Sequence, residues 1–532
     1  MTGRPPLSSS ATGRWRLFRR AAALDIFGLS PVSSYPEFER GLVASYYPGG
    51  RGVPRGEWVR QIARTLVRGM VSWGRCLSSP LRGDAAPAFP AGGIGWVVRT
   101  RNQRASMEPI AAELGMPPES IDDLWGRRIN RLATRHAFLF LPMLAVRFLW
   151  CNPSLRRTFR HSAGSYLRLY GTYIEARRSL ERSRPALVVL GNDHVGEYNV
   201  IRVAAQDAGV PTVYIQHACV AGYFPPLRFD WALLDGRDAA EKYLTRPTEA
   251  KVFLVGIAKL DDIASRASCE ADAGDAAGRD RRLRIGVCFN ALDDEDFIEQ
   301  TLETVREAFP DADVVARLHP ATRPTIVRRV QQLVETLSVD LSDSRGQAAI
   351  DFVATLSVMV CGASSIILEA AAAGVPSVAY FSERATDVYG FVANGLCHRA
   401  ENPTDLPGEI QRAVAVDRGE LIKKVGFYSE GFGNPDWESS VVRSAKLIRK
   451  IAALSNSRFK SDAPEGGTND VPEIEENWRA EQIRGQRVHV PASKQSGPPG
   501  GPNPSQVCVT ATMVRRPPGR NVDRPDRSVD DA

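Results

Sequence analysis

Two segments in the second half of the chain decide the fold: ADVVARLHP at 312–320 and LSVMVCGASSIILEAAAAGVPSVAYF at 356–381. Each contains an apolar run of strand length that ends in polar residues, His319-Pro320 in the first and Gly362 to Ser365 in the second. Strands that alternate with helical segments predict a parallel sheet, and such sheets bind ligands outside the carboxyl ends of their strands. We therefore expect both polar groups at one sheet edge, around a nucleotide phosphate.

The same rhythm of strands and helices extends along most of the 532 residues, a length that predicts more than one domain. The predicted fold class is α/β, with two Rossmann-like domains facing a cleft, a helical N-terminal region and a disordered C-terminal tail. The predicted boundaries are a basic, loosely ordered start at 1–30, an N-terminal acceptor domain at 31–264 (helical at 31–185, Rossmann-like at 186–257), a linker at 265–281, a C-terminal nucleotide-donor-binding domain at 282–436, a C-terminal helix at 437–455 and a disordered tail at 456–532.

The charge of the chain is unevenly placed. The net charge is +7, but residues 1–185 hold 29 arginines, no lysine and 12 acidic residues, a balance of about +17. This predicts an anionic partner. No zinc-finger, RNA-recognition or basic-zipper pattern accompanies the arginines, so we expect no nucleic acid. An anionic membrane surface or an acidic polymer is the candidate partner, and an arginine-rich composition with solvated faces is the alternative.

Cysteines and hydropathy predict the compartment. The eight cysteines form no C-x-x-C pair, as is typical of reduced thiols in a cytosolic protein. No secretory signal is evident. The most apolar stretch, 137–150, is shorter than a membrane-spanning helix and contains Arg147. We expect a buried helix there, with contact to one membrane leaflet as the alternative. The predicted location is cytoplasmic, at the inner face of the cell membrane if that contact is made.

Ser364 and Ser365 stand between a strand and IILEAAAA, a run of helix-forming residues. Unpaired N–H groups at a helix start favour anions, so we expect this point to bind a phosphate of the donor. Plain N-capping by one serine is the alternative. Glu369 lies about one turn after Ser365 on the same face. It is predicted to accept hydrogen bonds from ribose hydroxyls, unless it is an exposed glutamate of the first turn.

His319 ends its strand, and Pro320 holds it extended at the sheet edge. From there the imidazole can donate a hydrogen bond to a phosphate oxygen of the departing nucleotide. A lone histidine more often has a structural role, but the neighbouring arginines and the serine pair favour the catalytic one. Arg317, two residues earlier, shares its face of the strand and is predicted to bind the donor too.

In the first Rossmann-like part, Gln216 and His217 end the strand-like run TVYIQHA. Histidine has an ordinary pKa near 6.5, which suits removal of a proton from an attacking hydroxyl. His217 is therefore a predicted catalytic base, with acceptor positioning or a structural role as alternatives. Gln216 is predicted on the acceptor side, as are Asp193 and His194 at the end of the preceding strand.

No metal site is predicted. The acidic residues Asp293 to Asp296 open a predicted helix, where carboxylates complement the helix dipole. No H-x-x-x-H, G-x-S-x-G or P-loop pattern is present, which argues against a metalloprotease, an α/β-hydrolase and a P-loop enzyme. No cofactor is expected, only a CMP-, CDP- or UDP-linked donor as substrate.

Residues 185–455 resemble GT-B-type glycosyltransferases, in particular bacterial polysialyltransferases, capsule Kdo transferases and CDP-glycerol glycerophosphotransferases of teichoic acid synthesis. The resemblance rests on GVPTVYIQHA, RLHP, CGASSIILEAAAAGVPSVAYF and GFGNPDWESSVVRSAKLI. It implies that His319, Ser364 and Ser365 hold the donor phosphate and that His217 activates the acceptor. The family usually has glycine after that histidine, whereas this chain has Ala218.

Together these observations predict a metal-independent transferase. It would move a sugar or glycerol phosphate from a nucleotide-activated donor to a glycan or lipid-linked acceptor of the cell envelope or capsule. A nucleotide-sugar epimerase of the same architecture is one alternative. A non-catalytic nucleotide-binding component of envelope assembly is the other.

Overall fold

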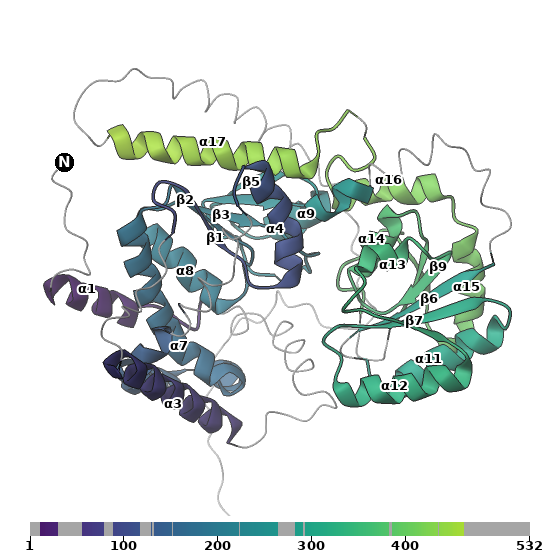
Figure 1. The fold of residues 1–532 in the computed structure, drawn as a ribbon, viewed down its shortest axis with the longest axis horizontal. Helices are drawn as coiled ribbons and strands as arrows, with labels where there is room; N and C mark the ends of the chain where they lie inside the picture. Colours follow the sequence, from purple (N-terminus) through teal and green to yellow (C-terminus); the bar gives the residue numbers. More distant parts are fainter. Residues whose placement is uncertain are drawn as a thin grey trace, which may run out of the picture. The chain divides into compact units, whose positions relative to one another are not determined.

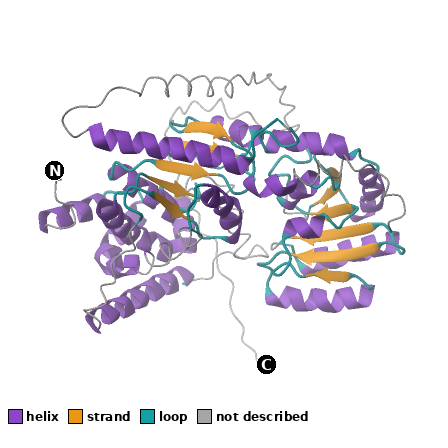
Figure 2. Cartoon of the chain, turned by 45° about the horizontal axis from the view of Figure 1, so that its top comes forward, coloured by secondary structure: helices purple, strands orange, loops and turns teal. Residues whose placement is uncertain are grey.

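The computed structural model describes residues 11–29, 56–78, 89–117, 129, 132–151, 153–222, 224–263, 282–290, 293–381, 386–434 and 436–461. Within them lie two sheets, each made of parallel strands and covered by helices (Figures 1 and 2). The predicted α/β class with two parallel-sheet parts is confirmed. The predicted linker at 265–281, residues 1–10 and residues 462–532 of the predicted tail lie outside the described residues. Residues 456–461, which were predicted to belong to the disordered tail, are instead the last part of a helix.

The first sheet has the strand order β1-β2-β3-β4-β5, with every neighbouring pair parallel. Four of its strands lie in the predicted runs. The fifth, β1, corrects the prediction that 31–185 is helical, because it pairs with β2 in a Gly- and Pro-rich stretch. The strands are β1 (Ile94–Val97), β2 (Leu187–Leu190), β3 (Thr212–Ile215), β4 (Trp231–Leu234) and β5 (Lys251–Leu254).

Helices cover both faces of this sheet, because successive strand residues point to opposite faces. Leu190 and Leu234 pack on one face against α7 (Pro153–Ser183), α8 (Gly196–Asp207) and α9 (Arg237–Leu244). Val189 and Leu233 pack on the other against α4 (Arg101–Glu113) and α17 (Ser440–Ser461). The predicted C-terminal helix therefore returns to cover the first sheet (Figure 1).

The second sheet has the order β11-β10-β9-β6-β7-β8, again parallel throughout. Its strands are β6 (Arg284–Phe289), β7 (Asp313–Leu318), β8 (Asp340–Ser342), β9 (Val358–Cys361), β10 (Ser377–Tyr380) and β11 (His398–Ala400). One face packs on α11 (Glu295–Ala308), α12 (Pro324–Leu337) and α15 (Leu406–Val414), and the other on α13 (Ala349–Val353), α14 (Ile366–Ala372) and α16 (Arg418–Tyr428). The described 3-10 turns of the chain are η3 (Thr134–His136), η4 (Ala258–Leu260) and η6 (Pro403–Asp405).

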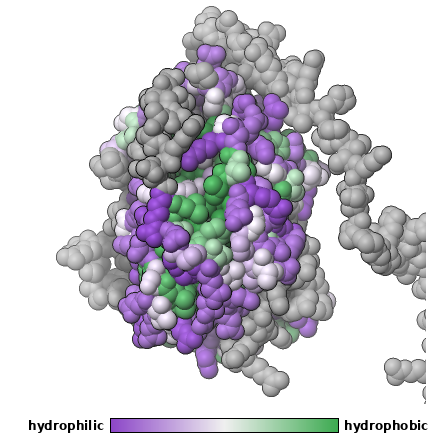
Figure 3. Space-filling view, turned by 90° about the vertical axis from the view of Figure 1, so that its right-hand side faces the viewer, coloured by the Kyte–Doolittle hydropathy of each residue, from purple (hydrophilic) through white to green (hydrophobic). Residues whose placement is uncertain are grey.

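Figure 3 shows one face of the molecule, on which hydrophobic residues gather in a band among hydrophilic ones.

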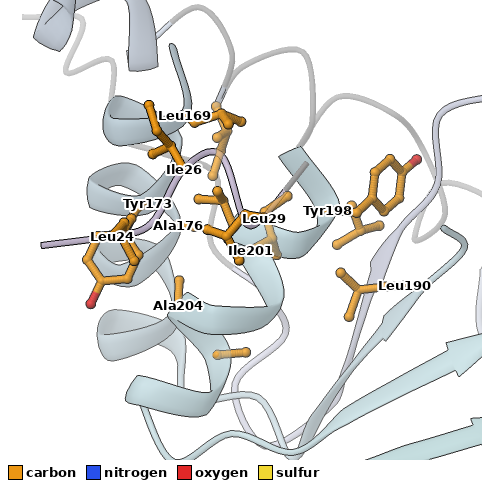
Figure 4. Packing of buried hydrophobic residues seen from close by; sticks show 14 of the residues in the cluster. Leu24, Ile26, Leu29, Leu169, Tyr173, Ala176, Leu190, Tyr198, Ile201 and Ala204 are labelled. Atoms are coloured by element: carbon orange, nitrogen blue, oxygen red, sulfur yellow. The ribbon is translucent and has the colours of Figure 1, made fainter. Parts of the chain in front are cut away.

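Residues 11–22 form a helix, and residues 23–29 pack after it, which corrects the prediction of a loosely ordered segment for this part of 1–30. α1 (Ala11–Ala22) buries Leu17 and Ala21, which lie one turn apart. The segment after it inserts Leu24, Ile26 and Leu29 against α7 and α8 (Figure 4). The four arginines among these few apolar residues hid the pattern. Arg20 fixes the helix further through two hydrogen bonds to Asp207, at 2.7 and 2.9 Å.

Among the described residues of the N-terminal region, two further helices pack against α7: α3 (Glu57–Ser78) and α6 (Ala137–Trp150). The predicted helix at 137–150 is confirmed, but only one of its faces is buried. The five cysteines with described side chains (Cys151, Cys219, Cys288, Cys361 and Cys397) are free thiols, as predicted.

The packing of α17 on the first sheet gives a stability prediction. Ile448 is fully buried there, so Ile448→Ala should leave a cavity and lower the free energy of unfolding by about 2–5 kcal/mol. Lys450→Ala, an exposed position on the same helix, should change it by less than about 0.5 kcal/mol. Urea unfolding followed by circular dichroism measures both. Equal stability of the two variants would show that α17 does not hold the sheet.

Candidate functional site

The carboxyl edge of the second sheet carries most of the predicted donor-binding residues. β6 lies between β7 and β9, and the pairs Phe289–Leu318 and Cys288–Cys361 fix the register. Asn290, the residue that follows β6, thus falls between His319 on one side and Ala363 on the other. Two strand spacings separate His319 from the loop that leads to Ser364, roughly 10 Å between backbones. A ligand bound over Asn290 would lie between the side chains that follow β7 and β9.

His319 is exposed at this edge rather than packed in the interior. Its Nδ1 accepts a hydrogen bond from the Ala321 N–H at 3.1 Å, and its carbonyl accepts from the Thr322 N–H at 2.9 Å. Because Nδ1 accepts, the proton of the neutral ring is assigned to Nε2. Surrounding protein atoms desolvate the ring in part and lower the pKa of His319. The side chain is thereby held as a neutral N–H donor.

The loop after β9 presents the two serines. Asn290 Nδ2 donates to the Ala363 carbonyl at 2.9 Å and so ties this loop to β6. Ser364 Oγ accepts a long hydrogen bond of 3.4 Å from the Ile366 N–H. Ser365 is the N-cap residue of α14, but its side chain makes no capping hydrogen bond. Plain N-capping therefore does not account for Ser365. The helix that follows it, α14, has only seven residues.

Glu369 and Arg317 both have partners within the protein. Glu369 forms an ion pair with Lys259, which follows β5 of the first sheet. It is half-buried, so the alternative of an exposed glutamate is wrong. Arg317 is buried and donates to Ser342 Oγ at 2.6 Å and to the Gln347 carbonyl at 2.8 Å. The donor-binding roles of Glu369 and Arg317 stay predictions.

Two residues at the second sheet's edge had not been predicted as part of the site. Asn290 follows β6 as His319 follows β7, and the same strand-end argument would have found it. Asp293 accepts a hydrogen bond from the Asn290 N–H at 2.6 Å, and its carboxylate lies beside Gly362. Burial raises the pKa of Asp293 to about 6, against the opposing effect of that hydrogen bond. Asp294 instead caps α11 through the Phe297 N–H, which is the dipole role expected of this acidic run.

The carboxyl edge of the first sheet brings the predicted acceptor-side residues together. His194 Nδ1 lies 2.9 Å from Asp193 Oδ1, and Tyr243 donates to the other carboxylate oxygen at 2.6 Å. Asn192 Oδ1 accepts from the backbone N–H groups of His194 and Val195 at 3.0 and 2.7 Å, which fixes the turn. Asp193 is buried and His194 is half-buried. The Asp193 carboxylate therefore lies behind the imidazole and fixes the orientation of its ring.

His217 follows the next strand and is half-buried, and its Nδ1 is buried without a hydrogen-bond partner among the described residues. Burial of the ring lowers the pKa of His217 to about 4. The charges of His194 and Lys259 act in the same direction and that of Asp193 opposes them. Gln216 is used structurally, because it donates to the Ala218 carbonyl at 2.9 Å and accepts from the Asp235 N–H at 3.0 Å. Its role toward an acceptor stays a prediction.

Lys259, which no sequence motif had indicated, connects the two edges electrostatically. Its burial disfavours the charged form, but the ion pair with Glu369 outweighs this, and the carboxyl group of Asp235 adds to it. The pKa of Lys259 is therefore raised, and the ammonium stays charged. Within the described residues no group of three His, Cys, Asp or Glu side chains could hold a metal ion.

No protein-family model matches the chain, and no curated protein matches it. Similar solved structures include the UDP-GlcNAc 2-epimerase of Neisseria meningitidis bound to UDP-GlcNAc, with 14% identity, a TM-score of 0.41, and coverage of 68% of this chain and 100% of that one. The UDP-GlcNAc 2-epimerase of Methanocaldococcus jannaschii is 14% identical, with a TM-score of 0.41 and coverage of 68% of this chain and 99% of that one. The calicheamicin glycosyltransferase CalG4 is 14% identical, with a TM-score of 0.39 and coverage of 70% of this chain and 99% of that one. Likenesses this distant carry no inference about activity.

The lowered pKa of His217 predicts a pH dependence of stability. An unfolded histidine titrates near 6.5 and the folded one near 4, so between these values the unfolded chain binds the extra proton. Stability should therefore fall as the pH drops from 6.5 toward 4. Between pH 7 and 4.5, wild type should lose about 2 kcal/mol more than His217→Asn. Urea unfolding at both pH values measures this, and identical losses would mean that the ring is not buried.

Proposed function

We propose that the protein is a metal-independent transferase for a nucleotide-activated donor. The observation that supports this most is the shared sheet edge at which His319 Nε2–H and the hydroxyls of Ser364 and Ser365 flank Asn290. All four groups can donate hydrogen bonds, so together they suit the oxygens of a phosphate group. They follow three neighbouring strands of one sheet, β6, β7 and β9, which preorganises them for electrostatic stabilisation of a leaving group.

The reaction is a displacement with a simple balance. The acceptor hydroxyl oxygen forms a bond to the sugar carbon, or to phosphorus for glycerol phosphate, while the bond to the nucleotide phosphate oxygen breaks. The hydroxyl proton passes to a base on the protein. The negative charge that appears on the leaving nucleotide is stabilised by hydrogen bonds from His319 and the serines.

Two histidines at the edge of the first sheet are candidates for that base. His217 was predicted from its strand-end position, yet a proton on its ring would be disfavoured by burial and by Lys259. His194 has Asp193 behind it, and Asp193 is in turn held by Tyr243. The Asp193 carboxylate orients the His194 ring, whereas Nδ1 of His217 has no hydrogen-bond partner among the described residues. We therefore propose His194 with Asp193 as the base and His217 as the neighbour that positions the acceptor hydroxyl.

The acceptor is proposed from the resemblance to capsule and teichoic acid transferases: a glycan or lipid-linked glycan of the cell envelope. We also propose a cytoplasmic location at the inner face of the membrane, where such acceptors are elongated from nucleotide-linked donors. Among the described helices, none is long and apolar enough to cross a membrane.

The leaving-group role is tested with His319→Ala. A thermal-shift screen with CMP, CDP, UDP and GDP first finds the nucleotide, since a ligand at 100 times its dissociation constant stabilises by about 2.7 kcal/mol. Turnover of the matching donor should then fall about 10²–10³-fold in His319→Ala at saturating donor. His398→Ala, at the start of the edge strand β11, should retain wild-type turnover. Near-normal turnover of His319→Ala would contradict the role.

The same assay separates the alternatives. Product that forms only when an acceptor is added supports a transferase. Epimerised donor in the absence of acceptor supports an epimerase instead, and nucleotide binding without turnover of any donor supports a non-catalytic component.

The base is tested by comparing His194→Ala with His217→Ala. The variant that lacks the base should lose about 10²–10⁴-fold in kcat/KM. We expect the larger loss for His194→Ala, with Asp193→Asn giving a loss of the same kind. A wild-type kcat/KM profile whose acid limb lies near pH 4, together with the larger loss in His217→Ala, would assign the base to His217 instead.

A further inference from the structure

Helix α6 has two apolar faces, and only one of them is covered. Ala137, Phe140 and Leu144 are buried against the rest of the N-terminal region. Leu149 and Trp150, toward the opposite side, are 68% and 86% exposed. The exposed positions of this helix follow three- and four-residue spacing and include no polar residue: Phe138, Leu139, Pro142, Ala145, Val146, Leu149 and Trp150.

The exposed face is held in a fixed orientation. The Phe140 ring stacks on Tyr170 of α7 with centroids 4.6 Å apart and on Phe18 of α1 at 4.7 Å. Arg147, the one charged residue of α6, turns toward the end of α1, where it donates to the carbonyls of Ala22 (3.0 Å) and Leu24. Because the charge of the helix is used internally, its open face is entirely apolar.

Helix α3 extends this apolar surface. Its exposed apolar residues Val59, Val67, Met70 and Val71 lie within one third of the helix circumference, which also holds the exposed Arg60. The two helices meet at Gly69, where an added methyl group would lie 3.5 Å from the Phe138 ring. We call the exposed apolar residues of α6 and α3 the apolar face.

Exposed arginines border the apolar face. Arg14, Arg16 and Arg19 surround Trp15, which is 59% exposed and stacks on Phe18 beside α6. At the other end of α6, Arg156 donates to the Leu149 carbonyl at 2.8 Å and is itself exposed. Positive side chains and tryptophans around an apolar helix face are typical of helices that lie in a lipid headgroup region.

The length of α6 fits a helix that lies on a membrane. Fourteen residues rise about 21 Å, less than the roughly 30 Å of a hydrocarbon core. A second copy of the chain would be a poor partner, because a two-fold contact places the same arginine border on both sides. An anionic leaflet satisfies both features, since its acyl region accepts apolar side chains and its phosphates attract arginine.

We propose that the apolar face of α6 and α3 docks the protein onto the surface of an anionic lipid bilayer. Leu149 and Trp150 enter the boundary between headgroups and acyl chains, and the arginines of α1 contact lipid phosphates. This inference does not depend on the transferase reaction, because none of these residues belongs to either sheet edge.

The test is co-sedimentation of the full chain with vesicles of phosphatidylcholine alone or of phosphatidylcholine with about 30% phosphatidylglycerol. The anionic lipid gives the second kind of vesicle a strongly negative surface. Wild type should bind the anionic vesicles more tightly and release them as ionic strength rises. Leu149→Ser/Trp150→Ser should weaken this binding at least about tenfold. Arg14→Gln/Arg16→Gln/Arg19→Gln should weaken it about fivefold for each arginine that touches headgroups.

The matched control is Val414→Ser, an exposed apolar position on α15 that should bind vesicles as wild type does. Both altered residues of the double variant are largely exposed, so its unfolding transition should match that of wild type, which circular dichroism checks. Equal vesicle binding by wild type and the double variant would overturn the proposal. The proposal would also fail if wild type did not bind vesicles but formed a dimer in light scattering, and the double variant did not form that dimer. The apolar face would then bind a second copy of the chain.

Discussion

The pairing of β6 with β7 on one side and β9 on the other is the constraint on which the candidate site depends. It fixes the register of three strand ends, so His319, Asn290 and the Gly362–Ser365 loop emerge at one level of the sheet. Helices bury both faces of these strands, which leaves little freedom for the register to slip. The hydrogen-bond donors of the site are thus positioned by the fold before any ligand arrives.

The edge of the first sheet has a different chemical character. Its imidazoles and carboxylates are arranged in contact with one another: Asp193 with His194 and Tyr243, and Asp235 near Lys259. Burial acts in opposite directions on the pKa values of two groups at this edge. It lowers the pKa of His217 to about 4 and raises the pKa of Asp235 well above its ordinary value. One edge therefore carries side-chain hydrogen-bond donors, and the other carries histidine, tyrosine and carboxylate groups in mutual contact. The ion pair of Lys259 and Glu369 joins them.

The strands and their polar ends could be predicted from the sequence because fully buried parallel strands are uninterrupted runs of Val, Ile and Leu. Strand β1 escaped prediction because glycines surround its four residues, and α1 because arginines outnumber its buried Leu17 and Ala21. The amphipathic pattern of α17 predicted a helix but carries no information on which sheet it covers. Arg317 was predicted to share the strand face of His319, but it is buried and β8 supplies Ser342 as its partner. Such partners depend on tertiary contacts that no local pattern encodes.

The central claim is that one phosphate group touches two strand ends of the second sheet. A crystal structure with the nucleotide diphosphate that stabilises the protein most would test it directly. The account predicts a phosphate oxygen within about 3.2 Å of His319 Nε2 and another within that distance of a Ser364 or Ser365 hydroxyl. A nucleotide bound with its phosphates away from His319, for example on Lys259 alone, would contradict it.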